Sequence, residues 1–217
     1  MSAPLVSAAG MEQALEVAKK MIADQMNLLV LFEPSVEELE DGFVLELVED
    51  VKKEEAFMII LDGRRISTEN AFYDQCRQTV PLADYMGSNL DALMDVFRGE
   101  AVGFDDKTTH AFWVWTHADI LHSAEPANFA AIYEVLAHSA REMSHGWYAT
   151  RGRFGKRHYE RIFYPPRKPV TLIITGRKGT LGAEAVRANS FFHHLRFAAE
   201  LFPDDSTYLR TVIVSEG

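Results

Sequence analysis

Six short runs of the chain are rich in apolar residues, and most of them are separated by amphipathic segments. The runs lie at residues 27–32, 43–48, 56–61, 110–115, 170–175 and 210–214. A strand covered on one face alternates apolar and polar residues, whereas a strand buried on both faces is apolar throughout. Uninterrupted apolar runs of strand length are typical of parallel sheets covered by helices. The sequence therefore predicts an α/β protein.

Apolar residues at helical spacing occupy much of the chain between these runs. The predicted helices are residues 11–26, 67–80, 128–144 and 183–202, with a further short helix ending near Gly99. From residue 56 to 175 the order of elements is strand, helix, helix, strand, helix, strand. This order favours a three-stranded parallel sheet packed with helices.

The chain divides into three parts by composition and by this order of elements. Residues 1–55 form an acidic N-terminal helix–strand–strand module, residues 56–176 form the central domain, and residues 177–217 form a C-terminal helix–strand segment. The two terminal parts either extend the central sheet or pack with each other as a second small lobe. A basic insertion at residues 148–168 lies within the central domain.

The charge of the chain is strongly acidic, with a formal net charge of −10 at pH 7. Such a surface repels nucleic acid and attracts basic proteins over about a Debye length, roughly 8–10 Å. Solubility alone also accounts for an acidic composition. The charge therefore favours a protein partner of basic character over nucleic acid, without identifying that partner.

Several classes of protein lack support in the sequence. No apolar run reaches the roughly 18 residues that a membrane helix needs, and the first residues do not resemble a secretory signal. Cys76 is the only cysteine, which suits a reducing compartment, and we expect a cytoplasmic protein. The motifs HExxH, paired CxxC, GxSxG and the P-loop do not occur, and the histidines show no metal-ligand spacing. We therefore expect no catalytic residues, no metal and no cofactor.

The most informative segment is residues 82–99, LADYMGSNLDALMDVFRG. Ser88 or Asn89 can cap a helix, and Gly99 is a natural residue to end one. The apolar face of this helix would carry Leu90, Leu93 and Phe97. The opposite face would carry Asp91, Asp95 and Arg98, with Met94 beside them. A plain solvated helix face gives the same pattern, so periodicity alone does not make this surface a binding site.

The order of residues in this segment resembles the barstar family, whose members inhibit barnase-type ribonucleases inside the cell. The positions that carry the resemblance are Tyr85, Gly87, Asn89, Leu90, Asp91, Ala92, Leu93 and Asp95. The resemblance runs without a gap from about residue 57 to residue 99. It continues more loosely through the strand at 110–115, the helix at 128–144 and the strand at 170–175.

The resemblance implies an inhibitor, or immunity protein, that plugs the active site of a basic ribonuclease or nuclease toxin and catalyses no reaction. In that family the helix and the loop before it face the nuclease, which implies a partner-binding role for Tyr85, Gly87, Asn89, Asp91 and Asp95. Asp95 would lie where the scissile phosphate binds. A carboxylate on a rigid helix suits this role because it accepts charge-assisted bonds from arginine and lysine.

Two positions on the predicted binding face depart from the family pattern. Met94 replaces a tryptophan, which removes an aromatic anchor, and Arg98 adds a positive charge one turn after Asp95. A pair between Asp95 and Arg98 at i, i+3 could partly neutralise the carboxylate. Glu142, on the later helix, is a candidate for a distal acidic contact with the partner.

The basic insertion supports a different hypothesis for function. Its cations are interleaved with aromatic residues, a composition that can stack bases and contact phosphates. Its candidate basic residues are Arg151, Arg153, Lys156, Arg157 and Arg161. The alternative function is thus a regulatory protein that binds RNA through residues 148–168. We favour instead a basic hairpin that lies on the acidic N-terminal segment, because the rest of the chain is so acidic.

Overall fold

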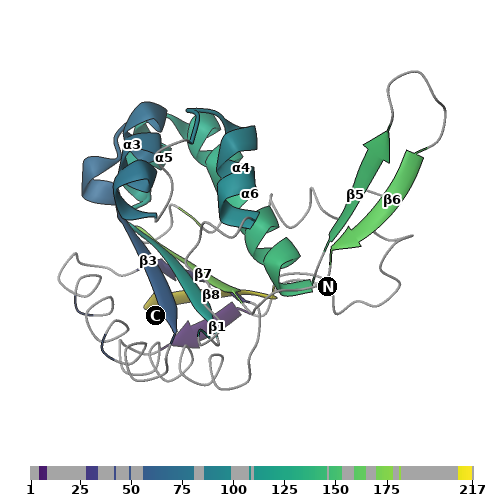
Figure 1. The fold of residues 1–217 in the computed structure, drawn as a ribbon. Coiled ribbons are helices and arrows are strands. Elements are labelled where there is room, and N and C mark those ends of the chain that lie inside the picture. The colour runs from purple at the N-terminus through teal and green to yellow at the C-terminus, as the bar shows by residue number, and fades with distance from the viewer. Residues whose placement is uncertain are drawn as a thin grey trace.

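The computed structural model describes residues 5–8, 28–33, 42, 49, 56–80, 86–98, 108, 110–145, 147–152, 159–164, 170–177, 181 and 210–216. Its main feature is a six-stranded parallel sheet with the strand order β1-β8-β2-β7-β4-β3 (Figure 1). The strands are β1 (Leu5–Ala8), β2 (Leu28–Glu33), β3 (Phe57–Asp62), β4 (Ala111–Thr116), β7 (Val170–Thr175) and β8 (Arg210–Glu216). The α/β prediction is confirmed, and β3, β4 and β7 are the expected three-stranded parallel sheet.

The terminal strands join this central sheet. β2 pairs with β7 on one side and with β8 on the other, and β1 follows β8 at the end of the sheet. The sequence left open whether the terminal parts extend the central sheet or form a second small lobe. Their described strands extend the central sheet. The predicted helices at 11–26 and 183–202 and the predicted strand at 43–48 lie outside the described residues. The domain boundaries near residues 55 and 176 stay predictions.

The described helices lie together on one side of the β3–β4–β7 sheet (Figure 1). They are η1 (Gly63–Arg65), α3 (Glu69–Thr79), α4 (Leu90–Arg98), α5 (Asp119–Ala124) and α6 (Pro126–His145). α5 was not predicted. None of the described helices is long and apolar enough to cross a membrane.

Residues near the ends of these helices tie them together. The hydroxyl of Thr68 accepts the backbone N–H of Ala71 at 3.2 Å and so caps α3. The carboxylate of Glu125, between α5 and α6, accepts the backbone N–H of Glu69 at 2.8 Å and the amide of Asn128 at 2.9 Å. These two hydrogen bonds, that of Asn128 first, lower the pKa of Glu125. The start of α3 is therefore fixed to the junction of α5 and α6.

The core lies between the sheet and the helices. Trp113 and Trp115 of β4 are buried, and they contact Phe97 of α4 and Phe72 of α3 at ring-centroid distances of 4.8 and 5.0 Å. Phe112 and Val114 alternate with these tryptophans along β4, and they are also buried. Both faces of β4 are therefore covered, which explains why its sequence is apolar throughout. Cys76 is a buried free cysteine in the same core, in keeping with a packing role.

Gly63 marks the point where the end of β3 meets the end of β4. A Cβ atom at this position would lie 1.9 Å from the carbonyl oxygen of Thr116 and 2.6 Å from that of His117. Both oxygens belong to the backbone, so neither can move without displacing the chain. The close approach of the two strand ends therefore requires glycine here.

We expect Gly63→Ala to destabilise the protein by about 3 kcal/mol or more, because the added methyl group separates β3 from β4. Gly87→Ala is the matched control. A Cβ there would meet two side-chain atoms and no backbone atom, the amide nitrogen of Asn89 at 3.0 Å and the Cβ of Ala92 at 3.7 Å, and should change stability by less than about 1 kcal/mol. Urea unfolding of the two variants tests the difference. Equal, small effects would contradict the packing requirement at Gly63.

His110, which precedes β4, is a buried histidine held in its neutral form. Its Nε2 atom lies 2.8 Å from the hydroxyl of Thr171 in β7. Burial lowers the pKa of His110 from 6.5 to about 4. The unfolded chain therefore binds a proton at this histidine at a pH where the folded protein does not.

The folding stability should consequently fall as the pH drops from 6.5 towards 4, and His110 alone should contribute about 3 kcal/mol of this loss. His110→Gln retains a hydrogen-bonding group without a titrating ring, so its stability should depend less on pH in this window. Urea unfolding of both proteins between pH 7 and 4 measures the two slopes. Identical slopes would show that His110 is not the group responsible.

Candidate partner-binding site on helix α4

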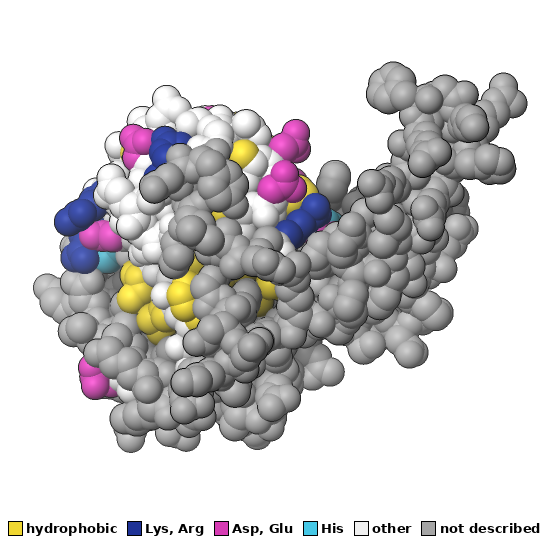
Figure 2. All heavy atoms as spheres, viewed as in Figure 1, with side chains coloured by type: hydrophobic (Ala, Val, Ile, Leu, Met, Phe, Trp, Pro, Cys, Tyr) yellow, Lys and Arg dark blue, Asp and Glu magenta, His cyan; other side chains and the backbone are white. Residues whose placement is uncertain are grey.

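Helix α4 is amphipathic, and the core fixes which of its faces meets solvent. Leu93, Val96 and Phe97 are buried, whereas Asp91 and Asp95 are exposed on the opposite face. Acidic side chains are visible at the surface over this helix (Figure 2). The predicted division of the helix into an apolar face and a carboxylate face is confirmed.

Asn89 is the residue that caps α4. Its side-chain oxygen accepts the backbone N–H of Ala92 at 2.8 Å, and its backbone carbonyl accepts the N–H of Leu93 at 3.0 Å. Of the two candidate caps in the sequence, the structure thus selects Asn89 over Ser88. Asn89 and Gly87 are both exposed and border the carboxylate face, and their contact with a partner stays a prediction. Tyr85 lies outside the described residues.

The loop before α4 is held by Arg77 of α3, a residue that sequence reasoning missed. The Arg77 guanidinium donates to the carbonyl oxygen of Met86 at 3.2 Å and to the hydroxyl of Ser88 at 3.3 Å. Asp74 anchors the same guanidinium at 2.6 Å. The spacing of Asp74 and Arg77 at i, i+3 is visible in the sequence, but the contact across nine to eleven residues is not.

Arg98 forms an ion pair with Glu142 of α6, and not with Asp95. The i, i+3 pair between Asp95 and Arg98 that the sequence allowed is not formed, because α4 packs against α6 and brings a different carboxylate to Arg98. The second oxygen of Glu142 lies 3.0 Å from Nε2 of His138. Both Arg98 and Glu142 had been candidates for contact with a partner, and that role stays a prediction.

Asp91 and Asp95 differ from Glu142 in their surroundings. Among the residues that the structure describes, no cationic side chain forms an ion pair with either aspartate. Met94, between them on the helix, is partly buried against the core. The described part of the site is therefore a capped helix with two solvated carboxylates, bordered by a neutralised arginine.

The basic insertion includes an antiparallel hairpin, β5 (Trp147–Gly152) and β6 (Tyr159–Tyr164), that projects away from the helices (Figure 1). Arg151 pairs in register with Glu160, and Arg161 with Thr150. The other three candidate basic residues, Arg153, Lys156 and Arg157, lie outside the described residues. The expected hairpin is confirmed, whereas its predicted contact with the N-terminal segment is untested.

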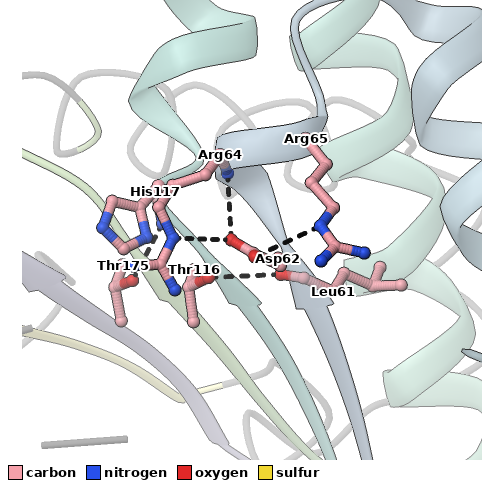
Figure 3. Close-up of polar contacts among 7 residues, drawn as sticks. All are labelled: Leu61, Asp62, Arg64, Arg65, Thr116, His117 and Thr175. Atoms are coloured by element: carbon pink, nitrogen blue, oxygen red, sulfur yellow. Dashed lines mark hydrogen bonds and ion pairs between the residues drawn. The ribbon is translucent and has the colours of Figure 1, made fainter. Parts of the chain in front are cut away.

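A second group of polar residues lies at the carboxyl ends of β3, β4 and β7 (Figure 3). Asp62 binds the side chains of Arg64 and Arg65, at 3.0 and 3.8 Å, and the backbone N–H of His117 donates to the hydroxyl of Thr175 at 3.3 Å. The contacts of Asp62 stay within the turn at Gly63, whereas that of His117 joins the end of β4 to the end of β7. No group of side chains suited to bind a metal occurs among the described residues.

Comparisons with known proteins find a family model that matches part of the chain. Residues 56–155 match the family model Barstar, described as barstar (barnase inhibitor), and this range runs from β3 through α4 and α6 into the basic insertion. No curated protein sequence matches the chain.

Similar solved structures share less than 25% identity with the chain. Drosophila ORC bound to AT-rich DNA and Cdc6 aligns with 14% identity and a TM-score of 0.47, covering 82% of this chain and 51% of that one. Drosophila ORC bound to DNA aligns with 13% identity and a TM-score of 0.46, covering 82% and 85%. The ORC2 protein of Aeropyrum pernix aligns with 11% identity and a TM-score of 0.49, covering 99% and 49%.

The chain thus spans about half the length of two of these three structures, and likeness at this level gives no information on function. The family model and the arrangement of β3, α3, α4, β4 and α6 agree with each other. The chain therefore contains a barstar-like domain.

Proposed function

We propose that this protein binds a basic ribonuclease or nuclease toxin and blocks its active site with helix α4 and the loop before it. The observation that carries the proposal is the pair of exposed aspartates, Asp91 and Asp95, on a helix that is capped at one end and buried along its apolar face. A rigid helix holds these carboxylates in place before the partner arrives. Little conformational entropy is then lost on binding.

The chemistry of a nuclease active site complements this face. Arginine and lysine side chains that bind a phosphate diester also form short, charge-assisted hydrogen bonds with a carboxylate. Asp95 would take the place of the scissile phosphate, and Asp91 would add negative charge one turn earlier. The protein would inhibit by occupying the site, without a reaction of its own.

The charge of the whole chain supports the same partner class. A net charge of −10 accelerates encounter with a basic protein and slows encounter with nucleic acid. A protein of this kind acts where its nuclease is made, and we place it in the cytoplasm. It would serve there as an immunity protein.

The remaining contacts determine which nuclease fits. Gly87 and Asn89 are exposed beside the carboxylates, and Tyr85 is proposed as the contact that precedes them. Met94 offers a smaller and more adaptable surface than the tryptophan of the family pattern. We therefore expect a partner whose surface opposite Met94 differs from that of a nuclease with a pocket for an aromatic ring.

We propose that the barstar-like unit extends beyond the family match at residue 155 to residue 176. β7 pairs with β4 over five residues, from Ala111 opposite Val170 to Trp115 opposite Ile174, and completes the three-stranded sheet. The hairpin β5–β6 is then an insertion between α6 and the last strand of the unit. Residues 1–55 and 177–217 are additions that supply further strands.

Asp95→Ala should weaken binding to a basic ribonuclease by at least about 30-fold, because the partner's cations lose a buried charged acceptor. Tyr85→Ala should weaken it as well. Glu134→Gln, which removes one negative charge from α6, serves as the control for long-range attraction. Calorimetric titration with barnase and inhibition of its RNA cleavage measure the effect. Unchanged affinity in both Asp95→Ala and Tyr85→Ala, with the circular dichroism spectrum intact, would exclude this face.

Arg77→Met should weaken the same binding about five- to tenfold, because the loop at residues 86–88 loses two hydrogen bonds and must be ordered by the partner. Hydrogen exchange at these residues should become faster while α4 stays protected. Gln75→Met is the matched control, since it removes a hydrogen bond to Thr79 on the same helix without touching the loop. Equal affinities of the two variants would show that Arg77 does not organise the site.

A further inference from the structure

Three charged or titratable side chains meet where α4 packs against α6. Arg98 pairs with one oxygen of Glu142, and His138 approaches the other oxygen at 3.0 Å. The side chains of Arg98 and Glu142 are only 22% and 13% exposed. This charge cluster is therefore more shielded from solvent and salt than an ordinary surface pair.

The position of Arg98 on α4 creates a conflict with the carboxylate face. Arg98 follows Asp95 by three residues, so the two side chains are neighbours on the helix surface and would attract each other. Such a pair would halve the charge of the face and place a cation towards a basic partner. In the structure the guanidinium instead turns to α6, where Glu142 compensates its charge.

We propose that Glu142 masks the charge of Arg98 and thereby keeps Asp95 available to the partner, an inference that rests on the proposed function. Glu142 is a positioning residue in this account, and it does not contact the partner. His138 lies beside the second oxygen of Glu142, so one oxygen of the carboxylate faces the guanidinium of Arg98 and the other faces the imidazole of His138.

The first experiment requires no partner and follows the urea midpoint of full-length variants. Asp95→Asn should leave the midpoint unchanged in the otherwise natural chain. It should lower the midpoint in Glu142→Gln, where the released Arg98 pairs with Asp95, and have no effect in Arg98→Gln/Glu142→Gln. An equal loss in all three backgrounds, or no loss in Glu142→Gln, would overturn the masking.

The second experiment measures binding to barnase at low and high salt. Glu142→Gln should bind about fivefold more weakly at low salt, and Arg98→Gln/Glu142→Gln should regain the natural affinity within about twofold. The double variant has the net charge of the natural chain, so long-range attraction is matched. Glu134→Gln, about two turns earlier on α6, has the net charge of Glu142→Gln and should bind normally.

The outcomes separate this inference from the proposed function. If the double variant binds as weakly as Glu142→Gln, Glu142 contacts the nuclease directly and the masking is wrong. If the natural chain and Asp95→Ala both fail to bind barnase, the proposed function fails for this nuclease. The urea midpoints then still decide whether Glu142 withdraws Arg98 from Asp95.

Discussion

The edge-to-face contact between Phe97 and Trp113 holds α4 on the sheet, and the binding face depends on it. The two rings lie 4.8 Å apart at an interplanar angle of 84°, and both are buried. Such a contact adds about 1 kcal/mol to the burial of two large side chains. Together with the burial of Leu93 and Val96, it sets the rotation of the helix about its axis. The rotation in turn decides that Asp91 and Asp95 point to solvent and that Arg98 points to α6.

The site therefore combines two ways of handling charge on one helix. The two carboxylates remain in water, which stabilises their charges while no partner protein is bound. A partner protein can still displace this water when it binds. The single cation of the face is withdrawn into a partly buried pair with Glu142. A helix with the same composition but a different rotation would lose this separation of charges.

Local pattern predicted the elements whose signal lies within one segment. The apolar runs at β3, β4 and β7 are long enough to read as buried strands, and Leu93 and Phe97 mark the inner face of α4. β1 and α5 were missed because they contain four and six residues, too few for a periodic pattern. The strand order β1-β8-β2-β7 could not be predicted either, since it joins strands from opposite ends of the chain.

The candidate site shows the same limit. The exposure of Asp91 and Asp95 follows from spacing on one helix and was predicted, whereas the cap was left open between Ser88 and Asn89 until the structure selected Asn89. The contacts of Arg98 with Glu142 and of Arg77 with Met86 cross between helices or loops, and no spacing rule reveals them. The sequence suggested Asp95 as a partner for Arg98 because a helix pattern reveals only neighbours at i, i+3 and i, i+4 on the same helix.

The pairing of β2 with β7 makes the barstar-like unit dependent on segments outside it. Five residues of β2, from Leu28 to Phe32, stand in register with Thr171 to Thr175 of β7. A fragment cut at residues 56 and 176 would leave that side of β7 with unpaired N–H and C=O groups along an apolar strand. Bare strands of this kind recruit other chains and aggregate. The unit can thus be recognised from its sequence, but its solubility depends on the strands that the rest of the chain adds to the sheet.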